Sequence, residues 1–254
     1  MTKTTPAGNF FALNARASRR VAAALHIESD KPFWRRFEVE AARTLAALPP
    51  GSRAVDLGGG RRCVYASVLR NRSSVNLVAV DVSAEELALN TDVDETIVAE
   101  AGYLPFPDSS IDLILSRTVL EHVPDVPQAA REMARVTRPG GTSLHFLPGR
   151  NALFAVAART LPFGPLLRLL HAVSPTTRGE VEFEVHYDHC HPVAIERAFR
   201  AAGFREVRVE TCWAASGYFE PFVPLFLLVS AYEAIVRTLG VKRLASYMIV
   251  HAQR

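Results

Sequence analysis

Short apolar runs alternate with amphipathic stretches through the middle of the chain. The connections between most of these runs are long enough for a helix, which predicts βαβ units around a parallel sheet. A helix over 126–137 ends at the sequence Arg-Pro-Gly-Gly of 138–141, where we expect a helix stop followed by a tight turn. The predicted strands of this middle part are 53–57, 76–82, 95–101, 111–117 and 142–147.

The flanking parts of the chain are read in the same way. Two basic helical stretches, 15–27 and 33–48, precede the first strand, and the apolar face of the second contains Phe33, Phe37, Ala41, Thr44 and Leu48. After the fifth strand the sequence is apolar and broken by prolines over 149–176. Further elements are then predicted: a helix over 193–202 ended by Gly203, a strand over 205–211, an apolar helix over 221–239 and a strand over 245–253.

Composition narrows the class of protein. The 254 residues are 49% hydrophobic and 22% charged, with a net charge of +3, which is typical of a packed globular chain and gives no surface for nucleic acid. Three scattered cysteines favour the reducing cytoplasm over a secreted disulfide framework. We expect no targeting segment and no membrane span, since the longest uncharged stretch, 221–232, contains two prolines.

The candidate chemistry begins where the first predicted strand ends. Asp56 precedes Gly58, Gly59 and Gly60, a pattern that lets a ligand approach the backbone closely. Asp81 ends the second strand, where a carboxylate can bind ribose hydroxyls, although it could also serve the following helix. The turn by itself leaves a nicotinamide cofactor and a methyl donor open. The dinucleotide pattern needs a third glycine where Cys63 stands, and a nearby acid suits a cationic ligand better than a pyrophosphate.

The wider motif set resembles the class I S-adenosylmethionine-dependent methyltransferases. VDLGGG, VAVDVS, LPFPDSSIDLI, LEHV and RPGG stand in that family's order and spacing over about residues 35–147. The resemblance implies an α/β fold with a Rossmann-like, seven-stranded, mostly parallel sheet whose last strand is antiparallel, together with N-terminal helices and apolar helical insertions. It divides the chain into a helical cap (1–50) and a methyltransferase domain (51–254) with lid insertions at about 149–190 and 213–240.

The resemblance also implies roles for individual residues around S-adenosylmethionine. Asp56, Gly58 and Gly60 would shape the methionine end of the pocket, and Asp81 would bind the ribose. Val82 would stack on the adenine, Glu100 and Ala101 would bind its nitrogens, and Ser116 would offer its backbone to the methionine. One departure is Arg62, where the family often has a further glycine, and it predicts a differently closed turn.

Methyl transfer needs alignment of the acceptor more than acid–base chemistry, because the sulfonium already activates the methyl group. For a hydroxyl acceptor, His122 in the LEHV segment is the candidate general base; otherwise Glu121 and His122 would orient the loop or the acceptor. The segment 186–191 adds His186 and Tyr187 as residues that would face the acceptor. Its polar residues could instead cap the helix that follows. Metal ligands are not expected there, because adjacent side chains on a short loop cannot readily converge on one ion.

Two apolar segments, 151–173 and 217–240, lie outside the cofactor fold and contain Arg159, Arg168 and Arg237. They could form a pocket for an apolar acceptor, dock on a membrane surface, or form core and a homodimer surface. We therefore predict a cytoplasmic methyltransferase, with peripheral membrane contact left open, that acts on a small apolar acceptor at oxygen or nitrogen rather than carbon. Specialised metabolism and lipid or glycan modification are candidate settings. The alternatives are a non-catalytic binding or scaffold protein of this fold and a nicotinamide-dependent reductase.

Overall fold

The computed structural model describes residues 6–66, 75–160 and 185–254. In it the chain forms two compact units, each built from separate stretches of sequence. Of the described residues, the first contains 6–32, 149–160 and 211–247, and the second contains 33–66, 75–148, 185–210 and 248–254. The predicted site residues all lie in the second unit.

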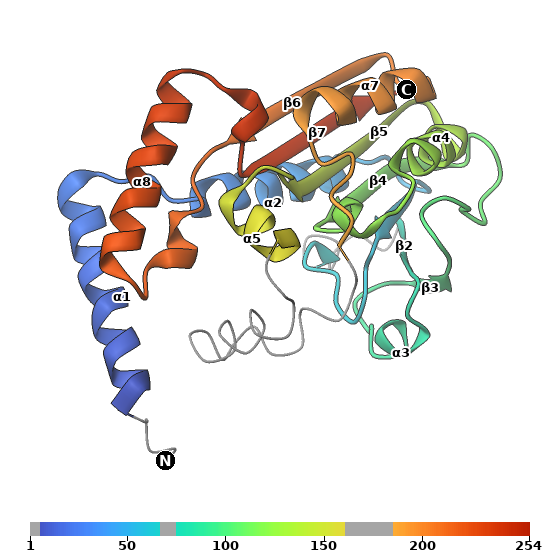
Figure 1. The fold of residues 1–254 in the computed structure, drawn as a ribbon. Coiled ribbons are helices and arrows are strands. Elements are labelled where there is room, and N and C mark those ends of the chain that lie inside the picture. The colour runs from blue at the N-terminus through green and yellow to red at the C-terminus, as the bar shows by residue number, and fades with distance from the viewer. Residues whose placement is uncertain (1–5, 67–74, 161–184) are drawn as a thin grey trace. The chain divides into compact units, whose positions relative to one another are not determined.

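A seven-stranded sheet is the framework of the fold, with strand order β3-β2-β1-β4-β5-β7-β6 (Figure 1). The pairs β1–β2, β1–β4, β2–β3 and β4–β5 are parallel. The predicted sheet, including its antiparallel last strand, is confirmed. The strands are β1 (Arg53–Leu57), β2 (Asn76–Asp81), β3 (Glu95–Val98), β4 (Ile111–Arg117), β5 (Thr137–Pro148), β6 (Glu206–Cys212) and β7 (Tyr247–Gln253).

The antiparallel direction of β7 follows from its backbone hydrogen bonds. The end of β7 meets the start of β5, where the Gly140 N–H donates to the carbonyl oxygen of Arg254 over 2.8 Å. On its other side, the Arg205 N–H donates to the carbonyl oxygen of Gln253 over 2.8 Å, just before β6 begins. A strand whose end faces the starts of both neighbours runs opposite to them.

Helices α2 (Lys31–Ala46) and α7 (Pro192–Ala202) cover opposite faces of the sheet. Successive strand residues point to opposite faces, and two neighbours in β5 show this. Phe146 packs on α2, with its ring 5.5 Å from that of Phe37, whereas the His145 ring lies 5.2 Å from Phe199 of α7. Leu45, rather than the predicted Thr44 and Leu48, joins Phe37 and Ala41 among the buried residues of α2.

The helices around the sheet have identifiable ends. α4 (Val126–Val136) begins at Asp125, whose side chain accepts the Gln128 N–H, and α7 ends at Gly203, which adopts φ +108° as a left-handed cap. Short helices are α3 (Ala84–Leu87) and the 3₁₀ segments η2 (Leu120–His122), η4 (Ser216–Phe219) and η5 (Lys242–Leu244).

One local prediction is wrong. The expected tight turn at 138–141 is instead the first part of β5, which starts at Thr137. The pairing with β4 shifts register there, since Ile111 pairs with Thr137 and Leu113 with Thr142. Gly140, at φ +81°, absorbs the irregularity in the way a glycine does in a β-bulge.

The first unit contains the long helices α1 (Pro6–Leu25) and α8 (Val223–Thr238) and the shorter α5 (Leu153–Thr160). The α1 helix packs on the start of α8, where the Phe11 and Phe222 rings meet edge to face at 5.3 Å and the Ser18 hydroxyl donates to the Glu220 carbonyl over 2.8 Å. The predicted apolar segment 217–240 is thus largely α8, whereas Arg168 and most of 151–173 lie outside the described residues. No helix among the described residues has the length and apolar character needed to cross a membrane.

Candidate active site at the carboxyl edge of the sheet

The predicted cofactor residues gather where the parallel strands end. Asp56 is the fourth residue of β1, Asp81 ends β2, and the two strands pair in register with Asp56 beside Ala79. Carboxyl ends of parallel strands form one edge of a sheet, which is where ligands bind in open α/β folds. The sheet therefore brings together the glycine turn and the acid that sequence spacing separates.

Close packing explains why the turn after β1 needs small residues. Gly58 has φ +71°, and a Cβ atom there would lie 2.2 Å from the Val119 side chain. A Cβ on Gly59 would lie 2.7 Å from the Cβ of Ala79. Gly60 has φ +44°, and a Cβ atom there would meet no close neighbour, since the nearest atom to it would be Oδ2 of Asp81 at 3.8 Å. The turn is thus packed against β2 and against the loop after β4, while its third glycine faces Asp81.

Asp81 holds two backbone amides of the edge. Its Oδ2 accepts the Gly60 N–H over 3.0 Å, and its Oδ1 accepts the Ser83 N–H over 3.0 Å. The helix-capping function considered for Asp81 belongs to Ser83, whose side chain accepts the Glu86 N–H. Both Asp81 oxygens retain further lone pairs for donors such as ribose hydroxyls.

Sequence reasoning missed the residue that holds the turn from the other side. The Asn90 side-chain amide donates to the carbonyl oxygens of Gly60 over 2.9 Å and Gly59 over 3.3 Å. Asn90 follows α3 in an irregular stretch, and nothing in its sequence neighbourhood distinguishes it from an ordinary loop asparagine. Contact with the glycine turn depends on tertiary structure.

A buried polar cluster lies beside the turn. Burial raises the pKa of Asp56 to about 6, although the Cys63 thiol donates to its carboxylate and Arg117 opposes the rise. The Tyr65 hydroxyl is buried and has no hydrogen-bond partner in the described structure. Burial also raises the pKa values of Cys63 and Tyr65, so both are protonated at neutral pH. A buried carboxyl group and an unpaired hydroxyl fit a ligand that carries an amino group, because such a ligand supplies the missing donors.

The predicted adenine-binding residues lie next to each other at the same edge. Val82 follows β2 and is 54% exposed, and Ala99, after β3, donates its N–H to the Asp81 carbonyl over 3.0 Å. Glu100 is exposed and Ala101 is buried. An exposed apolar side chain beside an exposed carboxylate offers a stacking surface and a hydrogen-bond acceptor, and their assignment to adenine stays a prediction.

Ser116 belongs to a buried hydrogen-bonded chain. Its hydroxyl lies 2.7 Å from Nδ1 of His145, whose Nε2 lies 2.6 Å from the Ser143 hydroxyl. Burial lowers the pKa of His145 to about 3, so the ring is neutral at physiological pH. A neutral imidazole donates through one nitrogen and accepts through the other, which holds both serine hydroxyls in place. This arrangement leaves the backbone of Ser116 at the sheet edge.

The candidate catalytic residues come together although His122 and His186 are 64 positions apart in the sequence. The Glu121 carbonyl oxygen accepts the His186 N–H over 2.8 Å and the Tyr187 N–H over 3.2 Å. Tyr187 is buried at φ +56°, and His122 is half-buried in η2. The loop after β4 and the segment before α7 are therefore joined through their backbones, next to the glycine turn that Val119 contacts.

Glu121 carries an unusual charge state. Its side chain is buried, its Oε2 has no hydrogen-bond partner in the described structure, and burial raises its pKa to about 8. At neutral pH the carboxyl group is therefore mainly protonated and can donate a hydrogen bond. From the sequence, Glu121 was expected only to orient the loop or the acceptor beside His122. A glutamate in a short helical turn is normally exposed, so its burial could not be predicted.

The segment 186–191 also caps the helix that follows it. Nδ1 of His191 accepts the Val193 N–H over 3.3 Å at the start of α7. The capping alternative for these polar residues is thus confirmed for His191. No group of three metal-ligating side chains is assembled within 6–66, 75–160 and 185–254.

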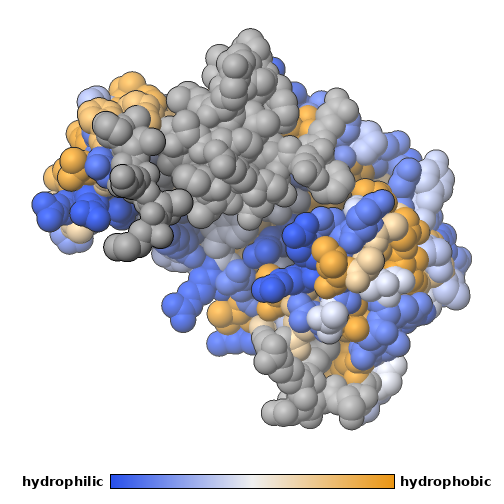
Figure 2. Space-filling view, turned by 90° about the horizontal axis from the view of Figure 1, so that it is seen from below, coloured by the Kyte–Doolittle hydropathy of each residue, from blue (hydrophilic) through white to orange (hydrophobic). Residues whose placement is uncertain are grey.

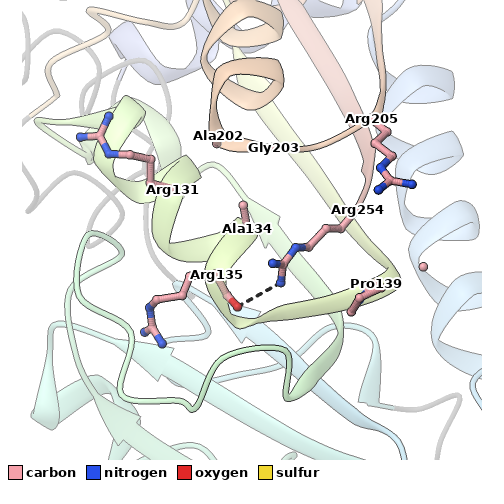
Figure 3. A pocket seen from close by; sticks show the side chains of 9 residues that line it. Arg131, Ala134, Arg135, Pro139, Ala202, Gly203, Arg205 and Arg254 are labelled. Carbon is pink, nitrogen blue, oxygen red and sulfur yellow. Dashed lines mark hydrogen bonds between the residues drawn. The ribbon is translucent and has the colours of Figure 1, made fainter.

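A separate cavity of about 670 Å³ opens at the amino edge of the same sheet (Figure 3). Arg254 reaches into it toward the carbonyl oxygen of Arg135, 3.1 Å away. The Arg135 guanidinium points away from Arg254 and holds the loop before β4 through Asp108, Glu132 and two carbonyl oxygens. The cavity lies at the opposite edge from Asp81, so it is not part of the candidate active site.

The fold and the carboxyl-edge site together define a Rossmann-like methyltransferase architecture, and comparison with known proteins identifies the family. A family model described as "Methyltransferase domain" matches residues 55–145. Demethylmenaquinone methyltransferase of Mycolicibacterium vanbaalenii is 34% identical over 181 residues, which cover 69% of this chain and 76% of that protein. The chain belongs to the class I S-adenosylmethionine-dependent methyltransferase family, as its motifs predict.

Other comparisons agree in fold. The demethylmenaquinone methyltransferase of Mycolicibacterium paratuberculosis is 36% identical over 145 residues. These residues are 56% of this chain, and the match spans only 60% of that protein's length. A solved S-adenosylmethionine-dependent methyltransferase from Mesorhizobium loti superposes with a TM-score of 0.53 at 20% identity, covering 86% of this chain and 98% of that one. Family membership answers the cofactor question left open by the glycine turn: the cofactor is S-adenosylmethionine rather than a nicotinamide.

Proposed function

We propose that this protein transfers the methyl group of S-adenosylmethionine to a small apolar acceptor of quinone-like character. The observation that carries the cofactor half is the closure of the glycine turn on Asp81, with the buried Asp56 and Tyr65 beside it. The acceptor half is supported by relatives named demethylmenaquinone methyltransferases, which match more than half of this chain.

The chain's own residues supply binding and orientation. Asp81 accepts the ribose hydroxyls, Asp56 faces the amino group of the methionine end, and Val82 with Glu100 and Ala101 borders the adenine. When bound, S-adenosylmethionine supplies a methyl group already activated by its positive sulfur. Binding the cofactor along the sheet edge would direct that group toward the region of η2 and 186–187, where the candidate catalytic residues meet.

An acceptor with a hydroxyl group needs to lose one proton. We assign this step to His122: as the acceptor oxygen bonds to the methyl carbon, the carbon–sulfur bond breaks, its electron pair stays on sulfur, and the hydroxyl proton moves to the imidazole. Tyr187 and His186 would border the acceptor, and the protonated Glu121 carboxyl group would donate a hydrogen bond in this region. An oxygen or nitrogen acceptor atom, as expected from the sequence, is part of the proposal.

Calorimetric titration tests the cofactor half first. We expect S-adenosylmethionine and S-adenosylhomocysteine to bind and NADH not to bind, because the turn lacks the third glycine of a dinucleotide site. Binding of NADH with no response to either sulfur compound would overturn the proposal. Incubation with S-adenosylmethionine carrying a labelled methyl group and a panel of apolar hydroquinones, phenols and amines then tests the acceptor, and NMR of the product identifies the methylated atom.

A further inference from the structure

Helix α8 is apolar on two faces, and one of them is open to solvent. Its inner face is buried within the first unit and contains Phe226, Val229, Ser230, Glu233 and Val236. Its outer face carries apolar residues at alternating spacings of three and four, which places them in one row along the helix. We call this row the outer stripe; it consists of Leu225, Leu228, Tyr232, Ile235 and Leu239.

The exposure of the outer stripe is high for such large side chains. Leu228 is 68% exposed, Ile235 59% and Leu239 69%. At 1.5 Å per residue the stripe extends roughly 21 Å along the helix. Scattered exposed leucines need no explanation, but a continuous row does, because contiguous apolar surface marks a binding face.

The neighbouring helix α1 adds exposed apolar residues and positive charge. Phe10 is 56% and Leu13 63% exposed, and Arg16 and Arg20 follow on the same side of the helix. The α1 sequence contains no acidic residue. In the picture viewed from below, hydrophobic and strongly hydrophilic side chains lie next to each other at the left, where Figure 1 places α1 and α8 (Figure 2).

Three acidic residues near these helices are buried or paired. Glu233 is buried and accepts the Ala215 N–H over 2.7 Å. Glu220 pairs with Arg19 over 2.6 Å, and Glu28 pairs with Arg237. No ion pair among the described residues joins Arg16 or Arg20 to a carboxylate, and η5 adds exposed Lys242 and Arg243 just after α8. The unit that carries the outer stripe therefore also carries exposed positive charge on α1 and η5.

We propose that the outer stripe of α8, with the basic side of α1, docks on the surface of an anionic lipid bilayer. Apolar side chains would enter the boundary between headgroups and acyl chains while arginines meet the lipid phosphates, as in helices that lie in a membrane interface. A second copy of the chain fits this face less well, because pairing would bring two arginine-rich α1 helices together. The biological role of this docking rests on the proposed function, because an apolar acceptor would be dissolved in the bilayer.

Vesicle sedimentation tests the docking without any catalytic step. The full-length protein is mixed with vesicles of equal parts phosphatidylglycerol and phosphatidylcholine, and with vesicles of phosphatidylcholine alone. We expect binding to the anionic vesicles, weaker binding in about 0.5 M salt, and much weaker binding to the neutral vesicles. Absence of binding to both kinds of vesicle, or equal binding to both, would overturn the proposal.

Substitutions locate the binding face. Leu228→Gln combined with Ile235→Gln should weaken vesicle binding by roughly tenfold, and Arg16→Gln and Arg20→Gln by about fivefold each. Val39→Gln on α2, at a residue 42% exposed, is the matched control and should bind like the wild type. Since all the changed side chains are exposed, circular dichroism and thermal unfolding should be unchanged. An equal loss in the Val39→Gln variant, or none in the α8 variant, would contradict the assignment.

Two further measurements distinguish membrane docking from dimer formation and from the proposed function. Sedimentation velocity that shows a dimer abolished by Leu228→Gln, without vesicle binding, would make the stripe an interface between copies and overturn the membrane docking. Calorimetry with S-adenosylmethionine reports on the proposed function independently. A chain that binds vesicles but not the cofactor would refute the proposed function and leave the docking intact.

Discussion

The backbone N–H of Gly60 donates to Oδ2 of Asp81 over 3.0 Å, which joins the turn after β1 to the end of β2. The carboxylate thereby fixes the turn, and its remaining lone pairs can accept further hydrogen bonds, such as those of the ribose hydroxyls in the proposed function. If Asp81 also binds the cofactor as proposed, its replacement should lower cofactor affinity more than it lowers the free energy of unfolding.

Asp81→Asn should weaken S-adenosylmethionine binding by about 1.5–3 kcal/mol, because an amide replaces a charged acceptor of two hydrogen bonds. Asp92→Asn in the nearby loop is the control, since the Asp92 side chain is exposed. Isothermal titration calorimetry on both variants measures the difference. Equal affinity in the two variants would refute the ribose assignment.

Gly59→Ala should destabilise the fold by about 1–3 kcal/mol and weaken cofactor binding. Its new Cβ would lie 2.7 Å from the Cβ of Ala79 and 3.0 Å from the Asp56 carbonyl oxygen, so β1 or β2 has to move. Gly217→Ala is the matched control, because no atom lies within 4 Å of the Cβ that it adds. Urea unfolding should separate the two variants, and a stable Gly59→Ala protein would contradict the packing described for the turn.

Glu121→Gln should change how stability depends on pH. The pKa of this carboxyl group rises from 4.5 to about 8 on folding, so between these values the folded chain binds the extra proton. The free energy of unfolding therefore falls as pH rises from about 4.5 to about 8, by at most a few kcal/mol from this group. The amide removes that contribution, and the decline should flatten.

Urea unfolding at several pH values measures this effect. Burial raises the pKa of Asp56 to about 6 and that of Glu233 to about 7. These two groups should therefore cause part of the decline in the free energy of unfolding in the wild type and in Glu121→Gln alike. Glu206→Gln, at an exposed carboxyl group, should follow the wild-type curve. Parallel curves for the wild type and Glu121→Gln would show that the buried carboxyl group is ionised after all.

His122→Asn should lower turnover by about 10²–10⁴-fold with a hydroxyl acceptor while leaving cofactor affinity near the wild-type value. Amine acceptors, which can react without a base, should lose much less. His26→Asn is the control, because His26 is exposed in the first unit and its φ of +52° suits asparagine. Steady-state rates with both acceptor types decide between a proton-accepting and an orienting histidine.

The sequence predicted the sheet well because its strands are short, buried and bounded by turn residues. β1 and β4 match the predicted 53–57 and 111–117. The start of β5 was missed, since Pro139, Gly140 and Gly141 indicate a turn and only pairing with β4 and β7 makes them extended. The residues assigned to the cofactor by the resemblance lie at the carboxyl edge, and their contacts with the cofactor stay predictions.

Other parts of the site depend on contacts that no local pattern contains. Asn90 reaches the glycine turn from a loop, and the Glu121 carbonyl oxygen joins two segments that are distant in sequence. The protonation of Glu121 follows from burial by residues elsewhere in the fold. Periodicity and motifs predict the local structure of the segment in which a residue lies. They cannot predict which distant residues it will contact in the fold.

The two compact units are interwoven along the chain. The backbone passes from one to the other after residues 32, 148, 184, 210 and 247. A protease that cuts at any single junction leaves the units joined by the remaining four, and no contiguous gene fragment encodes either of them alone. Each unit is therefore encoded by three separate stretches of the gene, and a change of reading frame or a truncation in one stretch alters both units.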